Sequence, residues 1–291
     1  MFKGSIVALV TPFKGNEIDE FALRKLVDWH ISEGTDGIVP VGTTGESPTL
    51  NHDEHERVVE IVIDQSNNRV PIIAGTGSNS TAEAINLLKH AESAGADAAL
   101  VVTPYYNKPT PEGLYAHYEA LDSASSGIPI IIYNIPSRSV IDINVDLMGR
   151  LSHLQSIVGV KDATSDISRI KEHNELCEDG FIQLSGEDET IYEYMINGGQ
   201  GCISVTANIL PKVCSDMHKA FSNNDLEEAK RLNNILMPLH KSLFIETSPS
   251  PVKYILSKMD LIDYEIRLPL VKIRQETKSI LDEIISNLEI K

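Results

Sequence analysis

"IVGVKDATSD" (residues 157–166) begins as a buried strand and then meets a charge. Its first four residues are mostly β-branched and apolar, which is typical of a strand covered on both faces. Lys161 follows directly, although burying an ammonium group without a partner is costly. A lysine at such a strand end indicates either a side chain with a chemical role or one that reaches solvent or pairs with Asp162.

Seven further runs share this apolar character on both faces, which is typical of parallel strands covered by helices. Together with SIVGVK (156–161), the predicted strands are SIVALV (5–10), GIVPVG (37–42), VPIIA (70–74), AALVVT (98–103), IPIIIYN (128–134), FIQLSG (181–186) and GCISV (201–205).

Helix-like segments alternate with these strands. Residues 19–34 carry apolar side chains at helical spacing, Phe21 among them, and end in glycine. Residues 80–95 open with a hydroxyl residue followed three positions later by Glu83, which predicts a capping box. The segment 188–199 shows the same helical character.

Eight successive strand–helix units predict an α/β fold, a (β/α)₈ TIM barrel that occupies residues 1–224. A doubly wound open sheet is the alternative, but the unit count and the missing G-x-G-x-x-G fingerprint weigh against it. Residues 225–291 contain no strand-like run and predict an all-helical C-terminal domain packed on the barrel. Its expected helices cover 225–244, 248–259 and 267–290.

The overall composition excludes several classes of partner. The net charge of −17 and the pI of about 4.9 disfavour nucleic acid and anionic lipid surfaces. Three cysteines without a C-x-x-C pair suggest neither a disulfide framework nor a zinc site. No apolar stretch approaches the ~18 residues of a membrane span, and no signal segment is evident. We therefore expect a cytoplasmic protein that binds no membrane.

Chemistry in such a barrel lies where the strands end. There, GTTGES (42–47) is a Gly-rich turn whose backbone N–H groups could cradle a small carboxylate, Tyr133 could hold or pass a proton, and Arg138 could bind an anion. Partial desolvation of Lys161 would favour its neutral amine, a nucleophile toward carbonyls. Each feature alone has a plain alternative: an ordinary βα turn, a buried tyrosine, a surface arginine. No side-chain cluster there suits a metal.

Taken in order, these motifs resemble the pyruvate-dependent class I aldolase family that includes dihydrodipicolinate synthase and N-acetylneuraminate lyase. The resemblance covers essentially the whole chain. It is carried by GSIVALVTPF, VGTTGES, AGTGSNST, VTPYYNKP, YNIPSRS, GVKDAT, LSGED, GCISVTANI and LMPLHKSLF.

Two details favour the dihydrodipicolinate synthase branch of this family. One is the double threonine of GTTGE, where neuraminate lyases carry Ser-Thr. The other is Arg138, which the synthases use for the carboxylate of aspartate semialdehyde and which sugar-acid lyases generally lack. Asp162 replaces the usual Glu and Ser139 a common Thr, and both changes are conservative.

The resemblance implies a role for each of five residues. Lys161 would form an imine with pyruvate, and Tyr133 would relay protons. Thr43 would link Tyr133 to Tyr106, which in the family reaches in from a neighbouring subunit. The backbone N–H groups of Thr43 and Thr44 would hold the pyruvate carboxylate.

The resemblance to the synthase branch implies a reaction without metal or organic cofactor. The enamine of pyruvate would attack L-aspartate-4-semialdehyde and give 4-hydroxy-tetrahydrodipicolinate, in the first committed step of lysine biosynthesis through diaminopimelate. Gly186 and the carbonyl of Ile203 would line the pocket that holds pyruvate. The family also implies a homotetramer built as a dimer of dimers.

A second site is suggested by NHDEHE (51–56), which is metal-like in composition but lacks the H-E-x-x-H spacing. A solvated helix start is the plain alternative. The resemblance implies a third interpretation, a site for lysine as feedback inhibitor at a dimer interface. Its residues would be Ser47, His52, His55, Asn79, Glu83 and Tyr105.

Two other functions stay open on the sequence. One is another pyruvate-dependent aldolase, such as a lyase of N-acetylneuraminate or of a 2-keto-3-deoxy sugar acid, against which Arg138 argues. The other is a non-catalytic barrel that binds a keto acid or lysine as a sensor. The joint presence of Lys161, Tyr133, Thr43 and Tyr106 argues against a sensor, since a sensor has no need for a proton relay.

Overall fold

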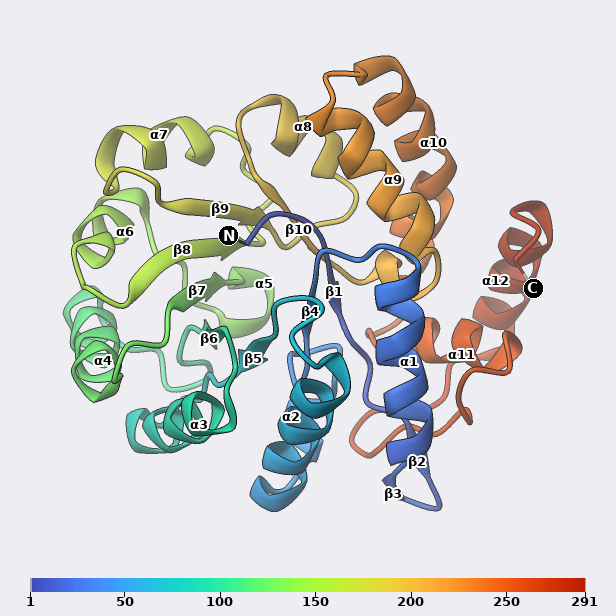
Figure 1. Ribbon diagram of the computed structural model, residues 1–291, viewed down its shortest axis with the longest axis horizontal. Helices are drawn as coiled ribbons and strands as arrows, with labels where there is room; N and C mark the ends of the chain where they lie inside the picture. The colour runs from blue at the N-terminus through green and yellow to red at the C-terminus, as the bar shows by residue number, and fades with distance from the viewer. Residues whose placement is uncertain (1, 291) are drawn as a thin grey trace.

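The structure of residues 2–290, a computed structural model, is a closed barrel of eight parallel strands (Figure 1). Neighbouring strands follow the order β4-β1-β10-β9-β8-β7-β6-β5, so the predicted (β/α)₈ barrel is confirmed. The strands are β1 (Gly4–Ala8), β4 (Gly37–Val39), β5 (Ile73–Gly75), β6 (Ala98–Val102), β7 (Ile130–Asn134), β8 (Ile157–Asp162), β9 (Ile182–Ser185) and β10 (Gly201–Ser204).

The barrel closes between β4 and β5 through few contacts. A single parallel bridge pairs Ile38 with Ile72, and the Gly75 N–H donates to the Pro40 carbonyl at 3.1 Å. A Cβ at position 75 would lie 2.4 Å from the Val41 oxygen, so only glycine allows this approach. The loop after β4 is thereby held close to β5.

Helices surround the strands on the outside (Figure 1). Each buries an apolar stripe against the strands, and a second apolar cluster fills the barrel interior. The helices are α1 (Glu20–Ser32), α2 (His52–Ser66), α3 (Thr81–Ala94), α4 (Pro111–Ala124), α6 (Val145–Ser152), α7 (Arg169–Leu176), α8 (Ile191–Ile196) and α9 (Pro211–Ser222), with single turns η1 (Ser47–Thr49), α5 (Pro136–Ser139) and η2 (Thr206–Asn208).

Three details of the barrel differ from the sequence prediction. Phe21 is 70% exposed, because it lies about 200° around α1 from the buried Leu23. Helix α8 is shorter than 188–199, since the Asp188 carboxylate instead accepts the N–H groups of Val205 and Thr206. A small unpredicted hairpin, β2 (Phe13–Lys14) with β3 (Glu17–Ile18), precedes α1.

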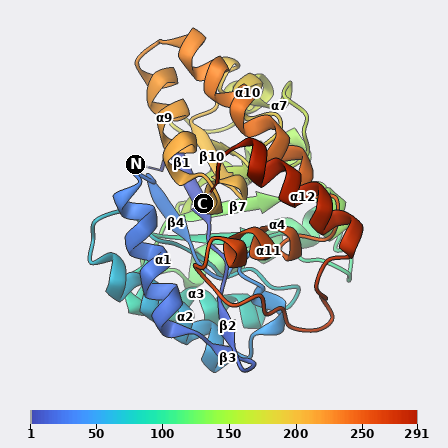
Figure 2. The ribbon, with the colours of Figure 1, turned by 90° about the vertical axis from the view of Figure 1, so that its right-hand side faces the viewer.

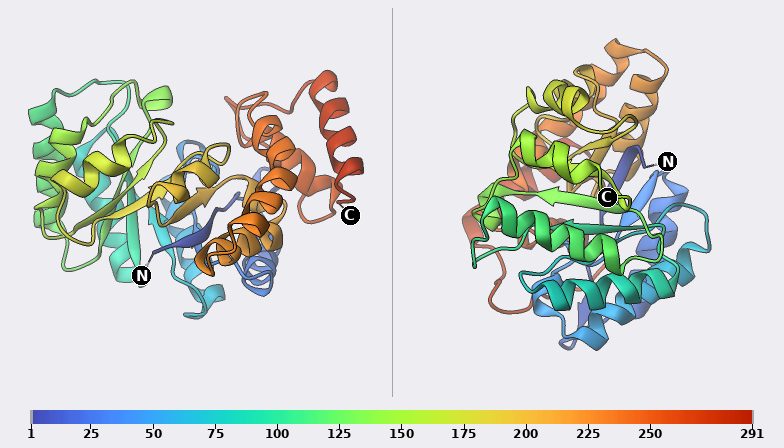
Figure 3. Two further views of the ribbon diagram at one scale, coloured as in Figure 1. Left: turned by 90° about the horizontal axis from the view of Figure 1, so that it is seen from above. Right: turned by 90° about the vertical axis from the view of Figure 1, so that its left-hand side faces the viewer.

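The chain after the barrel is helical, with α10 (Leu226–Ser242), α11 (Ser250–Lys258) and α12 (Gln275–Asn287). Figures 1 and 3 show these helices gathered on one side of the barrel, away from α4 and α6, and Figure 2 views the molecule from that side. The predicted helix over 267–290 is wrong for 267–274. Pro269 disfavours helical backbone at the residue before it, and the Arg267 guanidinium binds Glu54 on α2 through two bonds of 2.7 Å. The division at residues 224/225 stays a prediction.

Asn208 ties the end of the last barrel strand to the first. Its buried amide donates to the Ala8 carbonyl at 2.8 Å and to the Val205 carbonyl at 3.0 Å, and its oxygen accepts the Val10 N–H at 3.2 Å.

We therefore expect Asn208→Ala to lower the free energy of unfolding by about 2–4 kcal/mol, because three buried hydrogen bonds are lost and their partners stay buried. Urea unfolding followed by circular dichroism measures this. The exposed Asn223→Ala, at the end of α9, is the control, with a change within about 0.5 kcal/mol. Equal effects of the two substitutions would contradict the assignment.

Candidate active site

Lys161 and Tyr133 lie side by side inside the barrel mouth. Strands β7 and β8 pair Tyr133 with Lys161 in parallel register, so both side chains emerge on the same face. The Lys161 Nζ lies 4.1 Å from the centre of the Tyr133 ring, and Lys161 is only 6% exposed. The lysine therefore points inward and does not extend to solvent.

Gly186, at the end of β9, leaves room for that lysine. Its N–H donates to the Asp162 carbonyl at 2.6 Å. A Cβ there would lie 3.1 Å from the Lys161 Cε and 2.8 Å from the Ala163 Cβ. Ile203, on β10, is buried in the apolar cluster of the barrel interior.

The turn after β4 presents free backbone donors. Val41 (φ 48°), just before the turn, and Glu46 (φ 56°), within it, adopt left-handed backbone. The Thr11 hydroxyl donates to the Gly45 carbonyl at 2.7 Å. Within residues 2–290, the N–H groups of Thr43 and Thr44 have no acceptor. Consecutive unpaired N–H groups in such a turn form a cradle for an anion.

One cavity of about 410 Å³ connects this turn to the second predicted site. Thr43, Tyr133 and Arg138 line it, with Arg138 carried on the turn α5 that directly follows β7. The same cavity is lined by five residues of the predicted lysine site, namely Ser47, His52, His55, Glu83 and Tyr105.

Glu83 is the centre of charge at that end of the cavity. Its carboxylate lies 2.7 Å from the His52 Nε2 and accepts the hydroxyl of the buried Ser78. These two bonds lower the pKa of Glu83, so it is an anion at neutral pH. The predicted capping box is only half present: Ser80 accepts the Glu83 N–H, but the Glu83 carboxylate turns to Ser78 and His52 instead of the helix start.

Asn79 and Tyr106 stand apart from the other predicted residues. Asn79 receives a 2.8 Å bond from Asn107 on its carbonyl and does not line the cavity. Tyr106 is 87% exposed with a left-handed φ of 72°. No hydrogen bond joins Tyr106 to Thr43, or Thr43 to Tyr133, in the described part of the chain, so this single chain does not assemble the predicted three-residue link.

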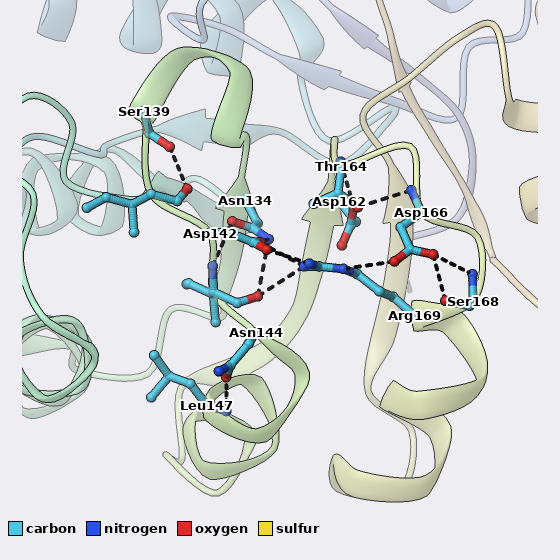
Figure 4. A network of polar contacts seen from close by, with 12 residues as sticks. Asn134, Ser139, Asp142, Asn144, Leu147, Asp162, Thr164, Asp166, Ser168 and Arg169 are labelled. Atoms are coloured by element: carbon cyan, nitrogen blue, oxygen red, sulfur yellow. Dashed lines mark hydrogen bonds and ion pairs between the residues drawn. The ribbon is translucent and has the colours of Figure 1, made fainter.

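A polar network that the sequence did not predict joins the ends of β7 and β8 to the segments that follow them (Figure 4), directly after Tyr133 and Lys161 in the chain. Asn134 and Asp162, the residues after them, are register partners. The Asn134 amide donates to Asp142 at 2.8 Å, and Arg169 from α7 donates to both Asp142 oxygens at 2.8 and 2.5 Å. This network fixes the segment that follows Arg138. The sequence did not predict this network because Arg169 and Asp142 are 27 residues apart and only the folded chain brings them together.

Glu187, near Lys161, was also not predicted from the sequence. It follows Gly186 and is half-buried. Burial, and then the neighbouring Asp188, raise the pKa of Glu187 to about 7, while the charges of Lys161 and Arg138 lower it. A carboxyl group that titrates near neutrality beside the buried lysine could exchange protons there.

Residues 2–290 contain neither a metal-binding cluster nor a helix that could span a membrane. No cluster of His, Cys, Asp or Glu is arranged to hold a metal ion. None of the described helices combines the length and the apolar character that crossing a membrane requires.

The sequence model of the dihydrodipicolinate synthetase family matches residues 1–288. The chain belongs to this family. A 4-hydroxy-tetrahydrodipicolinate synthase from Pelagibacter ubique (strain HTCC1062) is 58% identical, over 97% of each chain.

Solved structures of the family agree with the fold. A chloride-inhibited dihydrodipicolinate synthase from Acinetobacter baumannii, complexed with pyruvate, is 48% identical with a TM-score of 0.97 over 100% of both chains. The enzyme from Cyanidioschyzon merolae with lysine bound is 32% identical with a TM-score of 0.96, over 100% of this chain and 99% of that one. The predicted family and the prediction of an enzyme are thus confirmed.

His55 makes the stability of the site depend on pH. Desolvation lowers its pKa to about 4 in the folded chain, below the ordinary ~6.5 of an unfolded histidine. As pH falls below ~6.5 the unfolded chain binds this proton first, so stability is lost until about pH 4.

Between about pH 7 and pH 5, the free energy of unfolding of the unaltered chain should fall by about 2 kcal/mol more than that of His55→Gln. Urea unfolding at each pH measures the difference. His153→Gln, at an exposed histidine, should keep the steeper dependence. An unchanged slope in His55→Gln would show that His55 is not the group responsible.

Proposed function

We propose that this chain condenses pyruvate with L-aspartate-4-semialdehyde through a Schiff base on Lys161 and releases 4-hydroxy-tetrahydrodipicolinate. The observation that carries the proposal is the buried Lys161 amine packed on Tyr133, which lines the same cavity as the turn with free N–H groups. Family membership supports the reaction, and the pyruvate complex of the Acinetobacter relative supports the first substrate.

The first half of the reaction activates pyruvate. Its carboxylate accepts the N–H groups of Thr43 and Thr44, which holds the keto carbon in reach of the Lys161 amine. The amine adds to that carbon, and water leaves as the imine forms. Tyr133, against the lysine, carries protons to and from the departing oxygen. The cationic imine then draws electrons from the methyl group, which loses a proton to give the enamine.

The second half joins the aldehyde. The enamine carbon attacks the aldehyde carbon of aspartate semialdehyde, whose carboxylate pairs with the Arg138 guanidinium at the edge of the cavity. The amine of this substrate then adds to the imine carbon and displaces Lys161, which closes the ring and frees the enzyme. No metal or organic cofactor takes part, because the imine itself is the electron sink.

Assembly completes the site. The exposed Tyr106 would reach the Thr43 hydroxyl of a neighbouring subunit, in a homotetramer arranged as a dimer of dimers. The left-handed backbone of Tyr106 supports a functional role, since strained backbone at non-glycine residues clusters at active and binding sites.

Lysine would regulate the enzyme at the other end of the cavity. The Glu83 carboxylate suits the α-ammonium group, Tyr105 and Asn79 suit the carboxylate, and Ser47 with the two imidazoles faces the ε-ammonium end. The lysine-bound relative from Cyanidioschyzon merolae supports this proposal. The lowered pKa of Glu83 supports it too, since the site needs an anion at neutral pH.

Borohydride trapping tests the Schiff base. Incubation with pyruvate and borohydride should add one reduced pyruvate to the intact mass of the unaltered chain, and none to Lys161→Ala. The rate with aspartate semialdehyde should fall about 10³-fold or more in Lys161→Ala, since its nucleophile is lost. The exposed Lys171→Ala is the matched control and should behave as the unaltered chain. No adduct on the unaltered chain would favour a keto-acid-binding barrel.

Glu83→Ala tests the lysine site. We expect a variant that keeps its rate within about twofold but loses lysine inhibition by about 10-fold or more, because the carboxylate partner of the α-ammonium group is removed. Initial rates across a lysine series measure both effects. Glu92→Ala, on the same helix, should keep its inhibition. Normal inhibition in Glu83→Ala would reject this assignment of the site.

A further inference from the structure

A fully buried ion pair connects the C-terminal helices to the turn of the candidate active site. The Lys253 Nζ on α11 lies 2.5 Å from the Glu46 Oε1, and both side chains are 0% exposed. The two residues are 207 positions apart in the chain. The second Glu46 oxygen accepts the backbone N–H of Arg267 at 3.2 Å, so both partners of this carboxylate come from the segment after α10.

Glu46 belongs to the same turn as Thr43 and Thr44. Its N–H donates to the Thr43 carbonyl at 3.1 Å, and its backbone is left-handed, a conformation that a glutamate holds only under constraint. Gly45 lies between Thr44 and Glu46 in the chain, and its carbonyl accepts the Thr11 hydroxyl. The orientation of the two free N–H groups therefore depends on where the Glu46 side chain is anchored.

Within residues 2–290, Lys253 is the only side-chain cation that forms an ion pair with Glu46. Lys253 and Arg267 both pack on the Phe13 ring, each cation 4.2 Å from the ring centre. The Arg267 guanidinium is already engaged by both oxygens of Glu54 and by the Thr49 and Asn16 carbonyls. Removing Lys253 would leave the Glu46 side chain with one backbone N–H and no charge partner.

This pair is a poor source of stability. Burial lowers the pKa of Lys253 to about 8, even though the attraction of Glu46 raises it. The folded chain thus holds the ammonium form at a cost, which a pair of apolar side chains of similar size would avoid. What the ion pair provides instead is a fixed geometry, because a short bond between two buried charges tolerates little displacement.

We propose that Lys253 is a positioning residue for the first substrate: through Glu46 it sets the Thr43 and Thr44 N–H groups that receive the carboxylate of the keto acid. The all-helical extension is then part of the substrate site, although it touches no substrate. This inference rests on the proposed function, since it presumes that the turn binds pyruvate.

The test separates positioning from stability with two variants. Lys253→Met leaves Glu46 buried without a charge partner, so it should unfold at a lower temperature. The double variant Lys253→Met/Glu46→Gln removes both charges at similar volume and should recover most of that melting temperature. Lys258→Met, at an exposed lysine of the same helix, is the control.

The pyruvate concentration that half-saturates borohydride trapping is the decisive readout, because it involves pyruvate alone. We expect it to rise about 10-fold in the double variant, in step with the KM for pyruvate, while kcat at saturating pyruvate stays within about threefold. The KM for aspartate semialdehyde should not change. The control should match the unaltered chain throughout.

The outcomes distinguish the two proposals. A stable double variant with the pyruvate dependence of the unaltered chain would overturn the positioning role and leave the pair purely structural. Equal losses for both substrates would overturn it as well, since a general loosening of the barrel would then explain them. Failure of the unaltered chain to trap pyruvate would instead reject the proposed function. If Lys253→Met does not fold, the double variant carries the test.

Discussion

The parallel pairing of β7 with β8 is the constraint on which the rest of the site depends. Because the register sets Tyr133 beside Lys161, the phenol ring and the amine share one face and meet inside the barrel mouth. The residues that follow them, Asn134 and Asp162, necessarily point the other way, into the layer beneath the helices. The pairing of two strands therefore places the lysine and the tyrosine on one side and the first residues of their supporting network on the other.

Under the proposed function, this acidic chain binds small anions through local positive groups. The net charge of −17 repels anions at long range, so the positive field has to be concentrated where it is needed. Free N–H groups of the turn after β4 and the guanidinium of Arg138 supply it at one end of the cavity. At the other end the sign of the charge reverses, because the lowered pKa of Glu83 keeps its carboxylate anionic.

Supporting contacts from distant segments hold these groups in place. Arg169, from α7, fixes the loop after Arg138 through Asp142, and Lys253, from α11, reaches the turn after β4 through Glu46. In both contacts a cationic side chain binds a carboxylate, of Asp142 or of Glu46, that does not line the cavity. The barrel supplies strand ends, and these ion pairs decide how the short segments beyond them are oriented.

The sequence by itself determined the eight strands, their helices and the residues that end each strand, because apolar periodicity and the capping and turn residues act locally. It also predicted Lys161, Tyr133, Thr43 and Arg138 as a group, since all lie at or just beyond the carboxyl ends of strands of one barrel. Tertiary structure alone decided whether Glu83 would cap its helix or turn to His52 and Ser78. Pro269 already disfavoured helical backbone before it, and the bonds from Arg267 to Glu54 then held the start of residues 267–274 in place. Tertiary structure alone joined both predicted sites in one cavity and brought Lys253 to Glu46. Apart from Ser78, the partners in these contacts lie tens to hundreds of residues away. Local pattern carries no information about which of those distant partners a folded chain brings within bonding distance.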